Sequence, residues 1–409
     1  MNGELFCDGV SLEAVAAAAG TPVYVYSRSA IEESFRRFDA AFSSVPHLVC
    51  YATKANSNLS VLRVLSGLGA GADVVSGGEL RAALECGFPG DRIVFSGVGK
   101  TEDEIRMGLE AGILAFNAES ERELEKISEE AARQGRTARV AIRVNPDIDP
   151  KSHPYISTGL KHNKFGVAIG RAREVYETGR GLPGIRMTGI QAHIGSQITD
   201  PRPLGQTARE LTLLARELLA RGFPLETIDV GGGIGIAEPD GPALSPEEYA
   251  AVVLPEVSTL PLRVLIEPGR AIVGPAGALL TSVLYRKTNG GKQFVITDAA
   301  MNDLIRPSLY GAIHRIEPVA AGPAPHIVAD VVGPVCETSD FFARDVSLAG
   351  AEEGALLAIR DAGAYGFAMS SNYNFRPRAT EVLVEQGGFR VIRRRESYDD
   401  LVRLERGED

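Results

Sequence analysis

The first two thirds of the chain alternate between short β-branched runs and longer amphipathic stretches, and this alternation restricts the fold more than any other feature. Strands that alternate with helices pair in parallel. The strand-like runs number eight, which predicts a (β/α)8 barrel, with an open doubly wound sheet as the alternative. They lie near residues 47–54, 72–76, 92–96, 113–116, 139–144, 187–193, 227–231 and 262–267. The helical patterns lie near 29–45, 59–69, 78–87, 102–112, 120–134, 169–180, 203–222 and 245–257.

The pattern changes after about residue 270. Strand-like runs separated by turn residues follow, and no long helical pattern intervenes until a charged one near 396–406. A length of 409 residues suits two domains rather than one. We therefore expect residues 28–270 to form the barrel, and residues 1–27 plus 271–409 to form a β-rich sandwich or barrel.

Charge and cysteine usage exclude several classes of function. A formal net charge of -10 argues against non-specific binding to nucleic acid or to an anionic membrane. The four cysteines form no C-x-x-C pair, so neither a structural metal nor a disulfide framework is expected. The first residues, MNGELFCDGV, lack the pattern of a signal peptide, and no run approaches the ~20 apolar residues of a membrane span. The expectation is a cytoplasmic enzyme.

Residues able to do chemistry follow four of the predicted strands. In a barrel the carboxyl ends of the strands meet at one mouth, where active sites form. Lys54 follows the first strand, His193 the sixth, Gly231–Gly233 the seventh and Glu267–Arg270 the eighth. Each of these is weak evidence alone, because such residues are commonly surface, packed or turn residues. Their coincidence at one mouth predicts an active site.

These side chains suit pyridoxal phosphate. That cofactor needs a lysine for its resting Schiff base, which Lys54 can supply. Its phosphate needs backbone N–H groups, and a glycine turn allows their close approach, commonly after barrel strands seven and eight. A carboxylate such as Glu267 would keep the pyridine nitrogen protonated and make the ring a strong electron sink. The imidazole of His193 could stack on the ring.

Two sequences that look like nucleotide-binding motifs are discounted. GVGKT at Gly97–Thr101 is similar to a P-loop, but that motif requires a glycine where Val94 stands. GGGIG is similar to a dinucleotide-binding fingerprint, but the required third glycine falls on Ile236, and the residues that follow do not begin a helix.

Longer blocks extend the pattern over nearly the whole chain. They read YATKANSNLSVLRVLSGLGAGADVVSGGEL, RIVFSGVGKT, RVNPDIDPKSHPYISTGLKHNKFG, HIGSQI, DVGGGIG, EPGR, MNDLIRPSLYGA, GPVCETSDFFARD and DAGAYGFAMSSNYNFRPR. With these blocks the chain resembles the fold-type III pyridoxal-phosphate enzymes, which pair a barrel with a β domain, and most closely their diaminopimelate decarboxylase family. The resemblance implies conversion of meso-2,6-diaminopimelate to L-lysine and carbon dioxide through a Schiff base, the last step of lysine biosynthesis.

The resemblance also implies roles for individual residues. Lys54 would carry the cofactor and His193 would stack on its ring. The other residues implied at the cofactor are Ser196, Gly231, Gly232, Gly233, Glu267, Gly269, Arg270 and Tyr365. Those implied at the substrate are Arg270, Arg306, Tyr310, Glu337 and Tyr365.

Cys336 and Glu337 match a Cys-Glu pair that, in this family, reaches the active site from the partner subunit. Cys336 would be the proton donor, and a homodimer with shared active sites is implied. Thr338 and Ser339 depart from the Ser-Gly that is commoner after that pair. Two alternatives stay open: another decarboxylase of this fold, acting on ornithine, arginine or a carrier-bound amino acid, and a non-catalytic cofactor-binding homologue. The blocks HPYISTGLKHNKFG and IRPSLYGA favour diaminopimelate.

Overall fold

The computed structural model describes residues 3–150, 156, 158–159, 163–239, 241–320 and 326–407. The chain divides into two compact units. The barrel unit comprises Glu32–Ala237 and Pro242–Ala271. The β unit comprises Met1–Ile31, Glu238–Gly241 and Ile272–Asp409. Half of the HPYISTGLKHNKFG block, which favours diaminopimelate at the level of sequence, lies outside the described residues.

In the described part of the barrel unit, eight parallel strands form a closed ring. They are β4 (His47–Ala52), β5 (Gly71–Val74), β6 (Ile93–Phe95), β7 (Ala115–Ala118), β8 (Ala138–Asn145), β10 (Ile185–Gln191), β11 (Thr227–Asp229) and β12 (Arg263–Ile266). β12 pairs with β4, and β10 pairs with both β11 and β8, so the hydrogen bonding is continuous around the ring. The short strand β9 (Val167–Ala168) extends from β8. The predicted (β/α)8 barrel is therefore confirmed.

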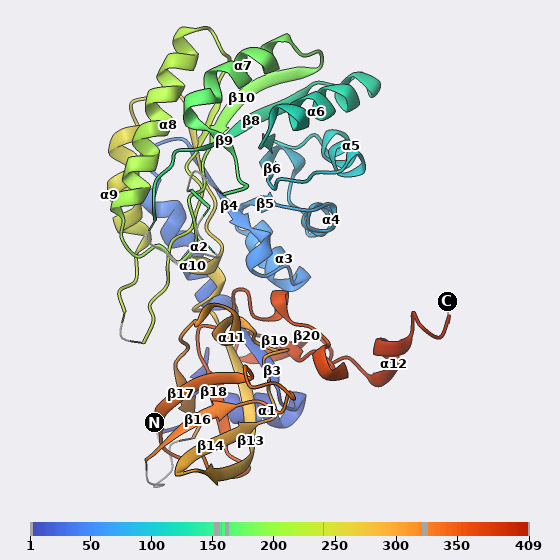
Figure 1. Cartoon of the computed structure of the whole chain (residues 1–409), viewed down its shortest axis with the longest axis vertical. Coiled ribbons are helices and arrows are strands. Elements are labelled where there is room, and N and C mark those ends of the chain that lie inside the picture. Colours follow the sequence, from blue (N-terminus) through green and yellow to red (C-terminus); the bar gives the residue numbers. More distant parts are fainter. Residues whose placement is uncertain are drawn as a thin grey trace. The chain divides into compact units, whose positions relative to one another are not determined.

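Helices alternate with these strands and cover the outside of the ring, as Figure 1 shows for α3 to α9. Their starts follow from local chemistry: Thr101 and Ser245 each accept a backbone N–H from a glutamate three residues later, whose side chain accepts in return. The α-helices are α2 (Arg28–Ala41), α3 (Leu59–Gly67), α4 (Gly77–Glu85), α5 (Glu102–Ala111), α6 (Glu121–Arg133), α7 (Ala172–Gly181), α8 (Arg202–Ala220) and α9 (Pro246–Val257). Single 3-10 turns are η1 (Thr53–Ala55), η2 (Gly90–Arg92) and η4 (Ile169–Arg171).

The barrel strands are buried on both faces, which explains why they read as continuous apolar runs. Leu48, Cys50, Val94, Leu114 and Leu265 form one apolar cluster. Because apolar side chains fill these positions, polar side chains at the carboxyl ends of the strands are confined to the mouth.

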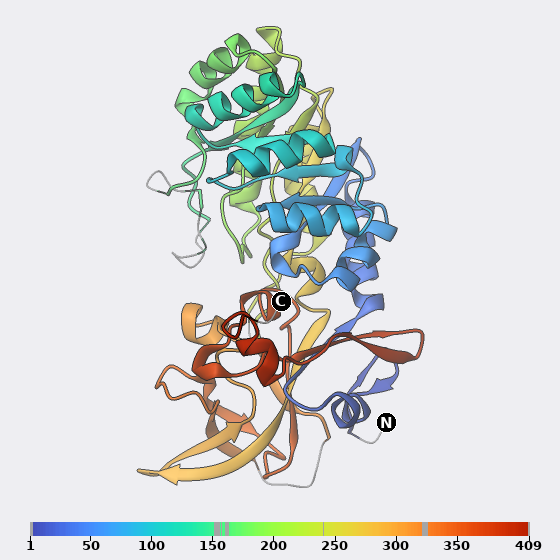
Figure 2. The ribbon, with the colours of Figure 1, turned by 90° about the vertical axis from the view of Figure 1, so that its right-hand side faces the viewer.

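The β unit is built around one long strand, β13, which pairs with three others. Its first residues pair with β3 and β18 and its later residues pair with β14, the yellow-to-orange hairpin in Figure 2. The order along the sheet is β17-β16-β14-β13-β3-β19-β20, with β18 on β13 and β15 on β18. The strands are β1 (Phe6–Cys7), β2 (Val10–Ser11), β3 (Val23–Ser27), β13 (Gly277–Asn289), β14 (Lys292–Thr297), β15 (Ile316–Pro318), β16 (Ile327–Val332), β17 (Phe341–Leu348), β18 (Leu356–Ile359), β19 (Thr380–Glu385) and β20 (Gly388–Arg393).

The helical segments after the barrel are short, as the sequence predicts. They are α10 (Arg270–Val273), α11 (Arg306–Tyr310) and α12 (Tyr398–Val402), with 3-10 turns η5 (Phe367–Met369) and η6 (Tyr373–Phe375). One longer helix, α1 (Leu12–Ala19), precedes β3 and packs its apolar face into the core of the β unit with Val23, Leu280 and Val382. Nowhere in the described residues does a helix combine the length and apolar character needed to cross a membrane.

Candidate functional site

Lys54 lies in η1, directly beyond the first barrel strand. Its Nζ donates to Oδ2 of Asp73 on β5 at 2.6 Å. Asp73 is fully buried, and its Oδ1 meets no hydrogen-bond donor among the described residues. The lysine is thus held at the mouth by a buried carboxylate that has unused acceptor capacity.

A second set of contacts fixes the turn that carries Lys54. The buried hydroxyl of Thr53 lies 2.9 Å from the backbone oxygen of Asp73 and 2.6 Å from Oε2 of Glu79. Oε2 of Glu79 also accepts the backbone N–H of Val75 at 2.8 Å. Burial raises the pKa of Glu79, although these hydrogen bonds oppose the shift. Together the contacts fasten η1 to the end of β5.

His193 follows β10 and is neutral. Its Nδ1 accepts the backbone N–H of Gly232 at 3.2 Å, which places the ring hydrogen on Nε2. Burial, and then the positive charges of Lys54 and Arg143, hold the pKa of His193 well below its ordinary value. The site therefore presents an uncharged imidazole.

Arg143, on β8, supports the loop that carries His193. Its Nη1 pairs with Oε1 of Glu119 at 3.0 Å, and its Nη2 donates to the backbone oxygen of His193 at 3.3 Å. Glu119 also accepts the backbone N–H groups of Gly97 and Gly166, at 3.1 and 3.0 Å. The buried Arg143–Glu119 ion pair thus contacts the backbone of three loops, at Gly97, Gly166 and His193.

The run Gly231–Gly233 follows β11 and is packed too tightly for any side chain. A Cβ at Gly232 would lie 2.0 Å from the backbone oxygen of Glu267, and one at Gly233 would lie 2.1 Å from that of Gly195. Gly233 also has φ +95°, which favours glycine. The run forms a turn of bare backbone, which is the form that an anion-binding loop requires.

Glu267 and Asp229 are two buried carboxyl groups at the ends of β12 and β11. Glu267 accepts from Nε2 of Gln191 at 3.2 Å, and Asp229 accepts the backbone N–H of Gly231 at 2.9 Å. Burial raises the pKa of both carboxyl groups, and each of them lies near the negative charge of Asp73.

Arg270 begins α10, where it is 5% exposed, and its Nη2 donates to Oγ of Ser196 at 3.0 Å. Gly269 lies against the strand that precedes Lys54, since a Cβ there would come within 3.0 Å of Cβ of Ala52. These contacts bring the Glu267–Arg270 segment, the loop after β10 and the turn of Lys54 to one end of the barrel.

The β unit carries a second group of predicted residues. Cys336 and Glu337 are exposed on the loop before β17. The backbone N–H of Cys336 donates to Oδ1 of Asn374 at 2.9 Å, and the hydroxyl of Tyr373 donates to Glu337 at 2.7 Å. Hydrogen bonds from Ser339 and Tyr373 lower the pKa of Glu337. Glu337 is therefore an ionised, accessible carboxylate near neutral pH.

Arg306 and Tyr310 lie on α11, which contacts that loop. The guanidinium carbon of Arg306 lies 5.8 Å from the centre of the Tyr310 ring, and Arg306 is 7% exposed. The hydroxyl of Ser308 donates to the backbone oxygen of Ser339 at 2.5 Å. Tyr365, beyond β18, adopts φ +55°, a conformation that non-glycine residues rarely take.

The structure therefore places the predicted residues in two groups. The barrel mouth carries Lys54, His193, Ser196, Gly231, Gly232, Gly233, Glu267, Gly269 and Arg270. The β unit carries Arg306, Tyr310, Cys336, Glu337 and Tyr365. Polar residues at the mouth that the sequence reasoning missed are Asp73, Glu119, Arg143, Gln191 and Asp229. Each of them lies within, at the end of, or directly after a barrel strand, and this position in the strand is the only sequence signal that could have found them.

Lys100, in the GVGKT stretch, is structural. Its Nζ donates to the backbone oxygens of Gly97 and Asn117, each at 2.9 Å, and to Glu123 at 2.7 Å. These three acceptors match the three hydrogens of the ammonium group. The lysine of the GVGKT stretch is thus used within the fold, and the stretch is not a P-loop.

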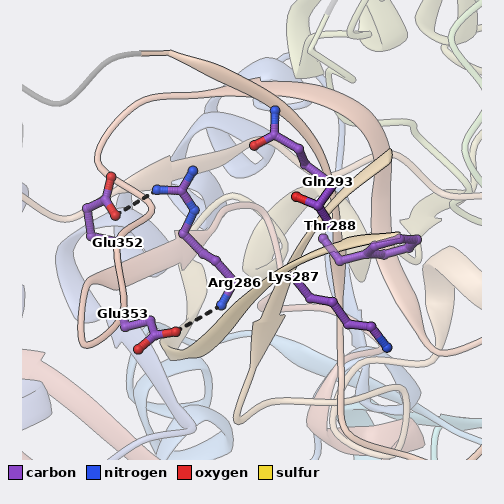
Figure 3. Close-up of a pocket in the computed structure, with 7 residues that line it drawn as sticks. Arg286, Lys287, Thr288, Gln293, Glu352 and Glu353 are labelled. Carbon is purple, nitrogen blue, oxygen red and sulfur yellow. Dashed lines mark hydrogen bonds and ion pairs between the residues drawn. The ribbon is translucent and has the colours of Figure 1, made fainter. Parts of the chain in front are cut away.

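A depression of about 550 Å³ lies in the β unit, away from any predicted site residue. Figure 3 shows its lining, where Arg286 pairs with Glu352 at 2.6 Å and donates its backbone N–H to Glu353 at 3.3 Å. Arg286 and Glu352 neutralise each other, and none of the residues predicted for the active site lies in the lining.

Comparison with known proteins shows which family this chain is similar to. Residues 28–274 match the model of the pyridoxal-dependent decarboxylases, pyridoxal binding domain. The chain is 48% identical to the diaminopimelate decarboxylase of Aquifex aeolicus, over 98% of this chain and 95% of that protein. It is 49% identical to the one from Neisseria meningitidis serogroup A, over 97% of each. The structure of the Helicobacter pylori enzyme complexed with L-lysine (I148L mutant) is similar at TM-score 0.93 and 44% identity, over 97% of this chain and 99% of that one.

Proposed function

We infer that this chain, which belongs to the pyridoxal-dependent decarboxylase family, is a diaminopimelate decarboxylase. It converts meso-2,6-diaminopimelate to L-lysine and carbon dioxide with pyridoxal phosphate as cofactor, the last step of lysine biosynthesis. The observation that carries this inference is the convergence of Lys54, His193, the glycine turn and Glu267 at one barrel mouth, in a chain that is similar to enzymes of that name over nearly its whole length.

The barrel mouth fits this cofactor. The turn Gly231–Gly233 has no room for side chains and offers backbone to a phosphate. The Asp229–Glu267 pair supplies buried acceptor oxygens for a protonated pyridine nitrogen. When bound, the cofactor withdraws electrons from the substrate carbon that loses its carboxylate. The donor set and the shape of the turn thus match the two ends of the cofactor.

We assign Lys54 as the residue that carries the cofactor through its amine. Asp73 holds that amine at the mouth. When the substrate amine displaces Lys54, the carboxylate of Asp73 would balance the positive charge of the freed lysine. His193 would lie against the cofactor ring. Because its pKa is held low, His193 would contact the ring as a neutral imidazole. It would therefore add no positive charge that competes with the ring nitrogen for Glu267.

Ser196, Arg270, Gly269 and the glycine turn would hold the rest of the cofactor. Arg270 is oriented by Ser196 and lies at the start of a helix beside the turn of Lys54. Hydrogen bonds between a guanidinium and an anion are among the stronger polar contacts in proteins. This supports a role for Arg270 toward either the phosphate or a substrate carboxylate.

Substrate selection is proposed to fall to the group of residues on the β unit. The distal end of diaminopimelate is an amino acid with both charges, so it needs a cation and an anion. Arg306, backed by the ring of Tyr310, is the cation, and the ionised Glu337 is the anion. Tyr365 would contact both cofactor and substrate.

Cys336 is proposed to donate the proton that replaces the lost carboxylate. Its side chain is exposed, and its backbone is fixed by Asn374, so the thiol is accessible on an ordered loop. Protonation at the former α carbon completes the product and leaves Cys336 as a thiolate, which regains its proton from water before the next turnover.

We further propose a homodimer in which Cys336 and Glu337 of one subunit complete the partner's barrel mouth. Residues 28–270 would then bind the cofactor, while residues 1–27 plus 271–409 complete the site and form the dimer interface. Large apolar side chains that are exposed beside this loop support an interface there: Leu309, Ile313, Tyr373 and Phe375. The four unpaired cysteines of the chain also suit the reducing cytoplasm, the proposed location.

The test is product analysis after incubation with meso-diaminopimelate and pyridoxal phosphate. Equal amounts of L-lysine and carbon dioxide are expected. Comparable turnover of ornithine or arginine would instead assign the chain to another decarboxylase of this fold. A cofactor absorption band that does not change on addition of any of these substrates would indicate a non-catalytic cofactor-binding protein.

A further inference from the structure

Both oxygens of the Glu337 carboxylate are held by neighbouring hydroxyl groups. The hydroxyl of Ser339 donates to Oε1, and the hydroxyl of Tyr373 donates to Oε2 at 2.7 Å. A carboxylate has about four lone-pair sites on its two oxygens, so each oxygen keeps capacity for a further donor. Glu337 is therefore fixed in one orientation and can still bind a cation.

The segment that carries Tyr373 is fastened to the loop of Glu337 by a second contact. Oδ1 of the next residue, Asn374, accepts the backbone N–H of Cys336 at 2.9 Å. Asn374 has φ +52°, a left-handed conformation that asparagine adopts more readily than most residues. Two consecutive residues, Tyr373 and Asn374, thus bind two consecutive residues of the loop.

This segment is itself anchored within the β unit. Arg376 donates from Nε to Oδ1 of Asn302 at 3.1 Å. Its Nη2 donates to the backbone oxygen of Asp298 at 2.5 Å. The hydroxyl of Tyr373 therefore approaches Glu337 from a backbone that is held in place.

The loop of Glu337 is also held from its buried side. Asp340 is 4% exposed and accepts two backbone N–H groups, that of Met301 through Oδ1 and that of Val335 through Oδ2, each at 2.7 Å. Both oxygens of this side chain are thus used to hold backbone. Because the main chain of the loop is fixed, what is left to orient is the side chain of Glu337.

We propose that Tyr373 is a positioning residue, which holds the carboxylate of Glu337 in the orientation that binds the distal ammonium group of the substrate. This rests on the proposed function, which assigns Glu337 to that ammonium. A glutamate side chain loses rotamer entropy when it binds a ligand, and one that is already oriented avoids part of that loss. In this role Tyr373 acts through Glu337 rather than on the reacting atoms.

The experiment compares the binding of two ligands to the cofactor-loaded enzyme by calorimetry. L-Lysine keeps the distal amino-acid end of the substrate, whereas ε-aminocaproate is L-lysine without its α-ammonium group. The dissociation constant of ε-aminocaproate divided by that of L-lysine therefore measures recognition of the ammonium. Tyr373→Phe should lower this ratio roughly 2- to 10-fold, the size of one hydrogen bond. The binding of ε-aminocaproate and kcat for meso-diaminopimelate should stay close to those of wild type.

Tyr285→Phe is the matched control for the loss of a hydroxyl group. Tyr285 lies on β13 and is 63% exposed, and its hydroxyl makes no hydrogen bond among the described residues. This variant should therefore keep the wild-type ratio. A second comparison removes the group that Tyr373 is proposed to orient. In the Glu337→Ala background, Tyr373→Phe should change the ratio no further, because no carboxylate remains to be oriented.

An unchanged ratio in Tyr373→Phe, or a further fall of the ratio in the Glu337→Ala background, would overturn the inference. If Glu337→Ala itself keeps the wild-type ratio, the assignment of Glu337 to the ammonium is wrong, and the inference fails with it. If Glu337→Ala lowers the ratio and Tyr373→Phe does not, only the positioning role of Tyr373 is wrong.

Discussion

Nζ of Lys54 lies 2.6 Å from Oδ2 of Asp73, and the strand pairing around the barrel fixes this contact. Ala52, the last residue of β4, is in register with Asp73 on β5, and Lys54 stands two residues further on. The amine is therefore positioned by the hydrogen bonding of two parallel strands rather than by a free loop. This gives the lysine that we propose as the cofactor carrier the rigid support that precise chemistry requires.

Lys54 should be the residue that carries the cofactor. Borohydride reduction of the loaded enzyme followed by peptide mapping should place the pyridoxyl label on Lys54, and Lys54→Ala should be nearly inactive although folded. Lys100 serves as the internal control, since its three hydrogens are all used within the fold. A label on any other lysine would exclude the assignment.

Gly233→Ala should destabilise the protein and abolish cofactor binding. The new methyl group would lie 2.1 Å from the backbone oxygen of Gly195 at a residue with φ +95°, so backbone must move. We expect a cost of ~2 kcal/mol or more in the free energy of unfolding. Gly99→Ala is the matched control, because a Cβ added there would meet nothing within 4 Å. Thermal unfolding and cofactor titration measure both effects, and equal behaviour of the two variants would contradict the role of the turn.

His193 should make the cofactor-free protein less stable in acid. Its pKa is lower when folded than the ~6.5 of an unfolded histidine, so below ~pH 6.5 the unfolded chain binds a proton that the folded chain does not. Stability is therefore lost as the pH falls below that value, by at most about 1.4 kcal/mol per pH unit, while above it His193 contributes no pH dependence. His193→Gln should narrow the fall in Tm between pH 7.5 and 5.5, values of about one unit on either side of ~6.5. An identical fall in both proteins would show that His193 is not held neutral.

Glu337→Gln should weaken substrate binding without disturbing the cofactor. The variant loses the negative charge proposed to bind the distal ammonium of the substrate, and such contacts are worth about 1.5–3 kcal/mol. KM for meso-diaminopimelate should rise roughly 10- to 100-fold, and the cofactor spectrum should not change. Glu353→Gln makes the same substitution elsewhere in the β unit (Figure 3) and should leave KM unaltered. An unchanged KM in Glu337→Gln would remove this residue from substrate recognition.

Shared active sites should allow two inactive variants to complement each other. Cys336→Ala should cost roughly 10²–10⁴-fold in turnover, the usual contribution of a positioned proton donor, and Lys54→Ala should be nearly inactive. After subunit exchange the mixture should recover up to about a quarter of wild-type activity, because half of the dimers are mixed and one of their two sites is whole. No recovery after verified exchange would place Cys336 in its own subunit's site or outside the chemistry.

Sequence alone was sufficient for the architecture of the barrel. The alternation of strands and helices is a local property, because a strand buried on both faces must be apolar throughout and a covering helix must be amphipathic. Lys54, His193, the glycine turn and Glu267 could be recognised by position for a related reason: the mouth of a barrel collects whatever follows its strands. The Cys-Glu pair at Cys336 and Glu337 had no such positional rule and was recognised by resemblance alone.

What the tertiary structure decided is the set of partners at that mouth. Asp73, Arg143 and Asp229 are charged residues inside or at the ends of buried strands, where the apolar pattern around them concealed their roles. Which carboxylate pairs with Lys54, and which amide binds Glu267, depends on strand register and on atoms of neighbouring strands brought within hydrogen-bond distance. Sequence spacing contains no such distances. The residue types follow from the chain itself, whereas the charge state of each follows from the burial and the neighbours that only the closed barrel provides.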